Sequence, residues 1–329
     1  MSANPQVTIL MATYNGARFL DEQIKSIQAQ TFTNWELIIR DDNSSDETLA
    51  IINSFITADS RIKLITNGTL HGSACINFSN LFDWVYTSGD KNYIMFTDQD
   101  DIWMEHKVER SLNFIKQQEN IYPNMPILGY SRFKYMSVSG DPIAQELQFP
   151  LELRLSTLLM ENYAWGCTMI MNQQLVKQIR KIPVNVVNHD YWVAMVAAAF
   201  GKAVLLDEPL LYYRQHDVNV SGTYENSSTK NRFARYFSNL DTMVKPLYMN
   251  FLTVKEFFNS YAGELSKANL KMLEDFIKGY SNSTIGLLSA IFRHHIWKVN
   301  FGKNIMMLYS LSFLRPKVYN MYLANVKKD

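Results

Sequence analysis

YIMFTDQDDIW, at residues 93–103, is an apolar strand-like run that leads directly into three carboxylates. Asp98, Asp100 and Asp101 lie within four residues of one another. Their mutual repulsion disfavours such a cluster unless a cation or a basic partner compensates. Mg²⁺ and Mn²⁺ favour oxygen ligands, so the stretch predicts a divalent metal site. The alternative is a turn in which Asp101 caps a helix expected at Trp103–Gln117.

The surrounding hundred residues alternate strand-like and helical segments, which is typical of a parallel sheet covered by helices. Strands are expected at Val7–Ala12, Trp35–Arg40, Arg61–Thr66 and Tyr93–Thr97. Helices are expected around Ala17–Gln30, Asp46–Thr57 and Ala74–Thr87. We therefore predict an α/β fold with a mixed, Rossmann-like sheet flanked by helices, followed by a helical C-terminal region.

Polar residues gather where three of these strands end. The three clusters are Thr13-Tyr14-Asn15, Asp41-Asp42-Asn43 and Asp98-Gln99-Asp100-Asp101. Ligands of open α/β sheets bind at the carboxyl ends of the strands, so the clusters predict one shared site. Asp41 and Asp42 suit hydrogen bonds to a ribose or a nucleobase, with capping of the next helix as the alternative.

Two common nucleotide-binding motifs are missing from the sequence. It has neither Gly-x-Gly-x-x-Gly after the first strand nor Gly-x-x-x-x-Gly-Lys-Ser/Thr elsewhere. This argues against a dinucleotide-dependent dehydrogenase and against a P-loop NTPase. If a nucleotide binds here, a metal ion must do much of the phosphate neutralisation.

The middle of the chain, from about residue 126 to 214, carries the other polar candidates. Strands are expected at Ile127–Ser131, Trp165–Met171, Val204–Leu206 and Leu210–Tyr212, and a helix at Tyr191–Phe200. His189 and Asp190 precede that helix, where either could act as a general base, or Asp190 could cap the helix. Arg214 suits a phosphate contact and His216 a metal ligand.

Three tryptophans lie close in sequence to these clusters. Trp103, Trp165 and Trp192 could stack on a sugar face, whereas packing in the core is the default for any one of them.

The distribution of charge separates the end of the chain from the rest. Residues 1–229 carry a net charge of −8 and residues 230–329 a net charge of +9, which cancel to +1 over 329 residues. A polar stretch, Gly222–Lys230, marks the expected domain boundary. The two cysteines form no metal-binding or disulfide pattern, and no export signal or membrane-spanning run is apparent, so we expect a cytoplasmic protein.

Several segments together resemble the family-2 glycosyltransferases with a GT-A fold, and more closely their bacterial rhamnosyltransferase-type members that build surface polysaccharides such as O-antigen. The segments are VTILMATYNGARFLDEQIKSIQAQT, WELIIRDDNSSDET, YIMFTDQDDIW, WGCTMIMN, HDYWVAMVAAAFG and YYRQHDVNVSG. They occur in the family's order. The resemblance covers about residues 5–222 and implies a catalytic domain over 1–222, with a nucleotide-binding half (1–104) and an acceptor half (105–222).

Carried over residue by residue, the resemblance implies a role for each cluster. It implies that Asp98 and Asp100 form the metal-binding Asp-x-Asp, joined by His216, and that Asp190 is the catalytic base. Many members of the family have Glu-Asp where this chain has His189-Asp190. The implied nucleotide-sugar contacts are Thr13, Tyr14, Asn15, Asp41, Asp42, Asp98, Gln99 and Arg214. The implied acceptor or sugar contacts are Asp101, Trp103, Trp165, Gly166, His189 and Trp192.

The implied reaction is a metal-dependent, inverting transfer of a sugar to a hydroxyl of a growing, lipid-linked glycan. dTDP-L-rhamnose is the first choice of donor, with UDP-hexoses and UDP-N-acetylhexosamines as alternatives. Two other functions remain open, nucleotidyl transfer on the same fold and a non-catalytic sugar-nucleotide or glycan-binding module. No nucleic-acid partner is expected.

The basic region 223–329 combines Lys, Arg and aromatic residues, as interfacial helices do. The segment Phe292–Lys303 is an example, and it predicts peripheral contact with the inner face of the cell membrane. A helical bundle used for homodimerisation is the alternative.

Overall fold

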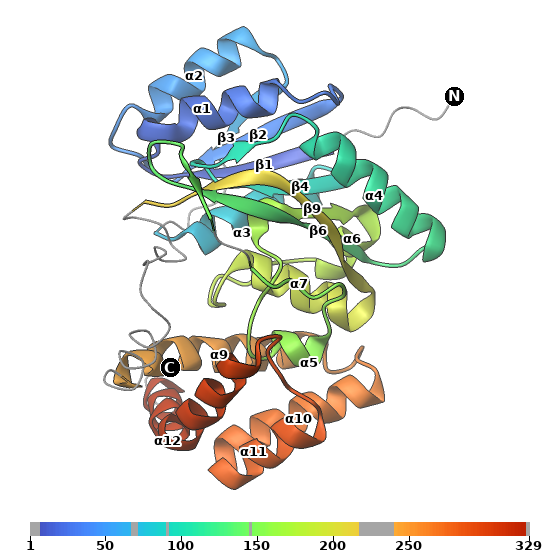
Figure 1. Cartoon of the computed structure of the whole chain (residues 1–329), viewed down its shortest axis with the longest axis vertical. Helices are drawn as coiled ribbons and strands as arrows, with labels where there is room; N and C mark the ends of the chain where they lie inside the picture. Colours follow the sequence, from blue (N-terminus) through green and yellow to red (C-terminus); the bar gives the residue numbers. More distant parts are fainter. Residues whose placement is uncertain (1–6, 67–71, 90–91, 145–146, 217–239, 327–329) are drawn as a thin grey trace. The chain divides into compact units, whose positions relative to one another are not determined.

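The computed structural model of the chain describes residues 7–66, 72–89, 92–144, 147–216 and 240–326 (Figure 1). The chain divides into two compact units. Unit 1 consists of residues 1–153, 163–184 and 188–222, and unit 2 of residues 154–162, 185–187 and 223–329. The domain boundary expected near 222–230 lies outside the described residues.

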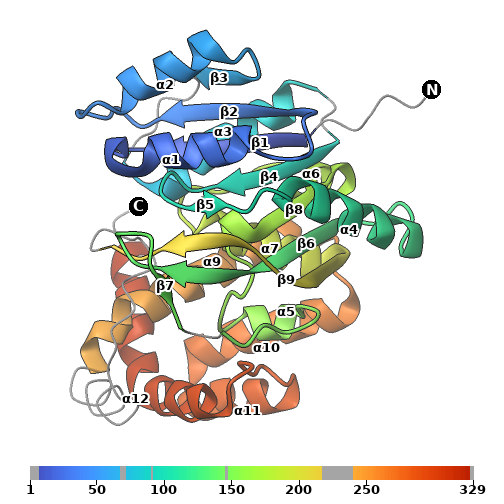
Figure 2. The same cartoon turned by 45° about the horizontal axis from the view of Figure 1, so that its top comes forward.

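Unit 1 is built on a mixed sheet, as the sequence predicts. The strands are β1 (Val7–Thr13), β2 (Trp35–Asp41), β3 (Ile62–Ile65), β4 (Tyr93–Thr97), β5 (Ile102–Trp103), β6 (Ile127–Met136), β7 (Pro142–Ile143), β8 (Met169–Asn172) and β9 (Lys202–Arg214). The described residues form a nine-stranded sheet in the order β3-β2-β1-β4-β8-β6-β9-β5, with β7 on β6 (Figure 2). The first four strands in this order are parallel, and β8 is antiparallel to both its neighbours.

Helices cover this sheet. They are α1 (Ala17–Gln28), α2 (Thr48–Ala58), α3 (Ala74–Thr87), α4 (Lys107–Ile121), α6 (Gln173–Ile179) and α7 (His189–Phe200). Side chains of β1 alternate between its two faces, and Val7, Ile9 and Met11 pack in one core cluster with the buried side of α1. Because β1 is buried along almost its whole length, its sequence VTILMAT is mostly apolar and has no regular polar alternation.

Several expected elements differ from the sequence-based prediction. The helix expected at Trp103–Gln117 begins at Lys107, because Ile102 and Trp103 pair with β9 as β5. The strand expected at Trp165–Met171 begins only at Met169, after a 3₁₀ turn at Gly166–Thr168.

The two strands expected at Val204–Leu206 and Leu210–Tyr212 are one strand, β9. Its register against β6 shifts next to Pro209, where an irregularity accommodates the missing backbone N–H.

Unit 2 is helical, as expected. Its elements are α5 (Leu155–Leu158), the 3₁₀ turn Leu240–Met243, α9 (Val244–Tyr261), α10 (Lys267–Asn282), α11 (Thr284–Arg293) and α12 (Phe301–Val326). Buried apolar side chains of the four longer helices, among them Phe257, Phe276, Leu287 and Leu311, form its interior. None of the helices within the described ranges is long and apolar enough to span a membrane.

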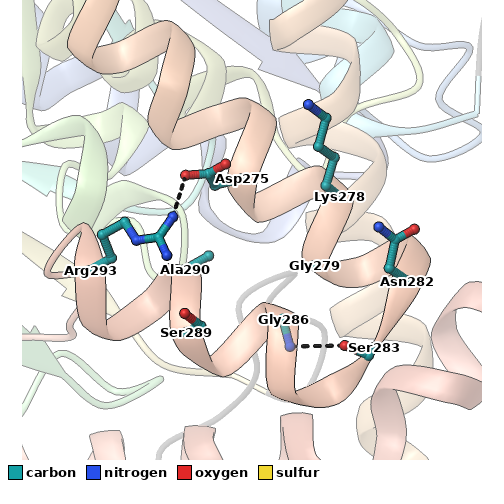
Figure 3. Close-up of a pocket in the computed structure, with 9 residues that line it drawn as sticks. All are labelled: Asp275, Lys278, Gly279, Asn282, Ser283, Gly286, Ser289, Ala290 and Arg293. Atoms are coloured by element: carbon teal, nitrogen blue, oxygen red, sulfur yellow. Dashed lines mark hydrogen bonds and ion pairs between the residues drawn. The ribbon is translucent and has the colours of Figure 1, made fainter.

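Helices α10 and α11 meet at a glycine contact. Ser283 is the C-cap of α10 and the N-cap of α11, and its Oγ accepts a hydrogen bond from the N–H of Gly286 at 3.0 Å (Figure 3). A Cβ on Gly279 would lie 2.5 Å from the Cα of Leu287. Backbone fills the space beside Gly279, so only glycine allows this close approach.

We predict that Gly279→Ala destabilises the protein by about 1–3 kcal/mol, because the added methyl group forces α10 and α11 apart. Urea unfolding followed by far-UV circular dichroism measures this change. Gly263→Ala is the matched control, since its Cβ would meet nothing within 4 Å. Equal stability of the two variants would contradict the packing argument.

Candidate active site

The polar clusters after β1, β2 and β4 lie at one edge of the sheet, as the sequence predicts. Parallel pairing places Thr13 beside Asp41 and Met11 beside Thr97, so the three strands end together. The Thr13 hydroxyl donates a hydrogen bond to Asp41 Oδ2 at 2.8 Å. Strand geometry alone therefore brings two of the clusters into contact.

Gln99 joins the loop after β1 to the loop after β4. Its Oε1 accepts a hydrogen bond from the backbone N–H of Tyr14 at 2.9 Å, and its Nε2 donates to Tyr14 O at 3.0 Å. A Cβ on Gly16 would lie 2.3 Å from Gln99 Oε1, so a glycine leaves room for this amide. The Tyr14 side chain is exposed at the same edge. The sequence analysis proposed Gln99 as a nucleotide contact and did not foresee this bridging role.

Asn15 and the two aspartates at the end of β2, Asp41 and Asp42, shape the neighbouring loop. Asn15 has a φ of 46°, and its Oδ1 accepts a hydrogen bond from the N–H of Ser45 at 2.8 Å. Asp41 Oδ1 accepts from the N–H of Ser44 at 2.8 Å, while the buried Asp42 accepts from the N–H of Gly72 at 2.9 Å. These two carboxylates order the loop, and α2 begins only at Thr48.

The end of β9 reaches the acidic loop, although more than a hundred residues separate them. His216 Nε2 lies 2.7 Å from Asp100 Oδ2. Arg214 is buried; its Nε donates to Asp100 O at 3.0 Å and its Nη1 to Val138 O at 2.9 Å. Asp101 Oδ1 accepts from the backbone N–H of Arg214 at 3.3 Å. The structure thus brings Asp100 and His216 together and places the Arg214 side chain against the loop backbone.

Three potential metal-ligating side chains cluster beside this contact. Ligand atoms of Asp98, Asp101 and Cys167 all lie within 4.8 Å of one another. Asp101 is fully buried, and its Oδ2 has no hydrogen-bond partner among the described residues. Two carboxylates with one unsatisfied oxygen fit a hard divalent cation. Cys167 was missed by the sequence analysis, because a single cysteine in an apolar segment carries no local signal.

Burial and like charge raise the pKa values of Asp98 and Asp101. Burial, and then the charges of Asp100 and Asp190, raise the pKa of Asp98 to about 7. Burial and the charges of Asp100 and Asp98 raise the pKa of Asp101 well above its usual value. Since the charge of Asp190 acts on Asp98, the first turn of α7 lies near the acidic loop. A bound cation would favour the ionised forms of these groups.

Lys107 is a second residue that the sequence analysis missed. It is fully buried at the start of α4, and its Nζ lies 4.8 Å from the centre of the Trp103 ring. Burial lowers its pKa to about 8, against the opposing influences of Cys167 and Asp101. The charge of Asp101 acts on Lys107, so this lysine is a basic group beside the acidic loop.

Asp190 does not cap α7. The N-cap residue is Asn188, and Asp190 lies in the first turn of the helix. Its Oδ2 accepts a hydrogen bond from the backbone N–H of Gly166 at 3.0 Å. The capping alternative is therefore wrong, and the carboxylate is held by the turn before β8.

His189 is buried among aromatic rings. Its ring stacks on Phe78 with 3.8 Å between centroids and meets Phe96 edge-on at 4.8 Å. A Cβ on Gly166 would lie 2.7 Å from His189 Nε2, so glycine makes room for the imidazole. Burial lowers the pKa of His189 to about 3, which keeps the ring neutral at physiological pH.

The three tryptophans contribute mainly to packing. Trp103 and Trp192 are 3% and 1% exposed, which leaves almost no surface for a sugar. Trp165 is half-buried, and its ring lies 4.6 Å from that of Phe133 and 5.2 Å from that of Tyr213.

We predict that burial of His189 lowers the free energy of unfolding of the protein at acidic pH. In the unfolded chain the His189 side chain binds a proton below about pH 6.5, whereas in the folded protein it stays neutral down to about pH 3. The free energy of unfolding therefore falls as the pH is lowered between these values, by up to about 1.4 kcal/mol per pH unit. Urea unfolding at pH 7 and pH 5 should show a smaller loss for His189→Leu than for the unchanged chain. An equal loss in both proteins would show that His189 is protonated when folded.

The sequence model of the family described as "Glycosyl transferase family 2" matches residues 8–180. A dTDP-rhamnosyl transferase, RfbG of Shigella flexneri, is 29% identical over 68% of this chain and 77% of its own length. WfgD of Escherichia coli, a UDP-Glc:alpha-D-GlcNAc-diphosphoundecaprenol beta-1,3-glucosyltransferase, is 31% identical over 52% of this chain and 61% of its own length.

Among solved structures, residues 1–349 of S. aureus TarS in complex with UDP-GlcNAc superpose with a TM-score of 0.58 and 16% identity. The match covers 93% of this chain and 79% of that one. At this identity the similarity shows the fold, which is that of the GT-A transferases.

Proposed function

Because this chain belongs to glycosyl transferase family 2, we propose that it transfers a sugar from a nucleoside-diphosphate donor to a hydroxyl of a bacterial surface glycan. One observation carries the proposal: His216 Nε2 lies 2.7 Å from Asp100 Oδ2 at the carboxyl edge of the sheet, and the charges of Asp100 and Asp190 act on Asp98 in the same loop. We place the reaction in the cytoplasm, where such donors are made.

Two relatives support the choice of donor and acceptor. Similarity to RfbG supports dTDP-L-rhamnose as the donor of this chain, and similarity to WfgD supports a UDP-hexose as the alternative. The diphosphoundecaprenol in the name of WfgD supports a lipid-linked acceptor. A few side chains in a pocket change sugar preference, so identities of 29% and 31% keep both donors in the proposal.

The edge loops supply the donor site in this proposal. A nucleoside would enter at the ends of β1 and β2, beside the exposed Tyr14 and the part-exposed Asp41. Asp98, Asp100 and His216 would hold a Mg²⁺ or Mn²⁺ ion, which neutralises the departing diphosphate. Arg214 keeps the metal-binding loop in place through the backbone oxygen of Asp100.

Asp190 is the proposed general base. It takes the proton from the acceptor hydroxyl as the oxygen attacks the anomeric carbon, and the bond to the nucleoside diphosphate breaks on the opposite face. This single displacement inverts the configuration. The N–H of Gly166 orients the carboxylate, and the neutral ring of His189 fills the space beside it. His189 is therefore assigned a positioning role.

Asp190→Asn should lower turnover by about 10²–10⁴-fold and leave donor affinity within a few fold, because the base acts in the transition state only. The assay is release of nucleoside diphosphate from dTDP-rhamnose or a UDP-hexose, with and without a lipid-linked glycan acceptor. The exposed Asp207→Asn is the matched control. Near-normal turnover of Asp190→Asn would remove Asp190 from this role.

The same assay separates the alternatives. Release that requires acceptor supports transfer of the sugar. Tight donor binding without release under any condition would favour the non-catalytic binding module, and release of pyrophosphate from a nucleoside triphosphate would favour nucleotidyl transfer.

A further inference from the structure

Helix α12 has two apolar faces, one buried and one exposed. Met307, Leu311, Leu314 and Val318 are buried in the interior of unit 2. A second set of apolar side chains on the same helix is exposed: Phe301 by 79%, Ile305 by 52%, Tyr309 by 38% and Phe313 by 59%. We call this second set the α12 stripe.

The α12 stripe is continuous along the helix. Its members are spaced four residues apart, so each lies about one turn from the next over roughly 18 Å. The rings of Tyr309 and Phe313 touch, with 4.7 Å between their centroids. Single exposed apolar residues are ordinary, but a run of aromatic and aliphatic side chains on one face marks an interaction surface.

The basic residues around the α12 stripe indicate which kind of partner it binds. Residues 276–328 contain eight Lys or Arg and no Asp or Glu. Lys303 follows Phe301 by two residues, Lys317 lies one turn beyond Phe313, and both side chains are about half exposed. The ion pair of Lys317 with Asp241 is solvent-exposed and therefore weak, whereas Glu161, the partner of Lys303, is only 21% exposed. The excess of basic residues in this segment still favours a positive surface around the stripe.

This pairing of an apolar stripe with flanking cations fits an anionic bilayer surface. Apolar side chains enter the region between headgroups and acyl chains, while lysines reach the phosphates. A symmetric dimer would instead bring the same positive surface of two copies face to face, which is unfavourable. We propose that the α12 stripe, with Lys303 and Lys317, binds the surface of an anionic lipid bilayer.

The test is co-sedimentation of the full chain with vesicles of phosphatidylcholine alone or with one quarter phosphatidylglycerol. The unchanged protein should sediment with the anionic vesicles, and less in high salt. The double variant Phe301→Ser/Phe313→Ser should bind at least tenfold more weakly, because two exposed rings no longer enter the lipid. Exposed positions should tolerate serine, and unchanged circular dichroism verifies the fold.

Ile121→Ser/Leu151→Ser is the matched control, since these apolar side chains of unit 1 are 61% and 71% exposed. It should bind vesicles like the unchanged protein. Absence of binding to anionic vesicles, or an equal loss in both double variants, would overturn the proposal. A lipid-free dimer that Phe301→Ser/Phe313→Ser converts to monomer would assign the stripe to a second copy instead. None of these readouts depends on glycosyl transfer.

Discussion

Repulsion among four carboxylates is the constraint on which the site depends. Asp98, Asp100 and Asp101 follow one strand, and the charge of Asp190, from a distant helix, acts on Asp98. The protein compensates with directed donors: His216 at Asp100, the N–H of Arg214 at Asp101 and the N–H of Gly166 at Asp190. The remaining negative potential lies at the edge of the sheet, where it attracts a cation and with it a diphosphate.

The backbone arrangement makes this convergence possible. β5 and the end of β9 pair directly after the acidic loop, so the chain returns from residue 214 to meet residue 100. Gln99 holds the opposite side of the same loop against Tyr14. The loop is therefore fixed from both sides by hydrogen bonds to backbone atoms. Such preorganised donors and charges are what electrostatic stabilisation of a transition state requires.

Much of the first half of the chain could be predicted from sequence, because buried parallel strands and their polar ends are local patterns. α3 and β4 have the predicted bounds. The buried Lys107 and Cys167 could not be predicted, since their environment is made by residues distant in sequence. The α12 stripe was hidden for another reason. A helix with apolar residues on two faces loses its simple amphipathic pattern, so only the packing shows which face is exposed.

Metal-dependent binding of a sugar nucleotide tests the central claim most directly. The measurement is the thermal stability of the unchanged protein and of Asp100→Asn with dTDP-rhamnose, UDP-glucose, UDP-galactose or UDP-N-acetylglucosamine, each with and without Mn²⁺. A ligand that binds the native state must raise the melting temperature. The account predicts a rise with one donor that requires Mn²⁺ and is lost in Asp100→Asn. A rise of equal size without metal, or in Asp100→Asn, would contradict it.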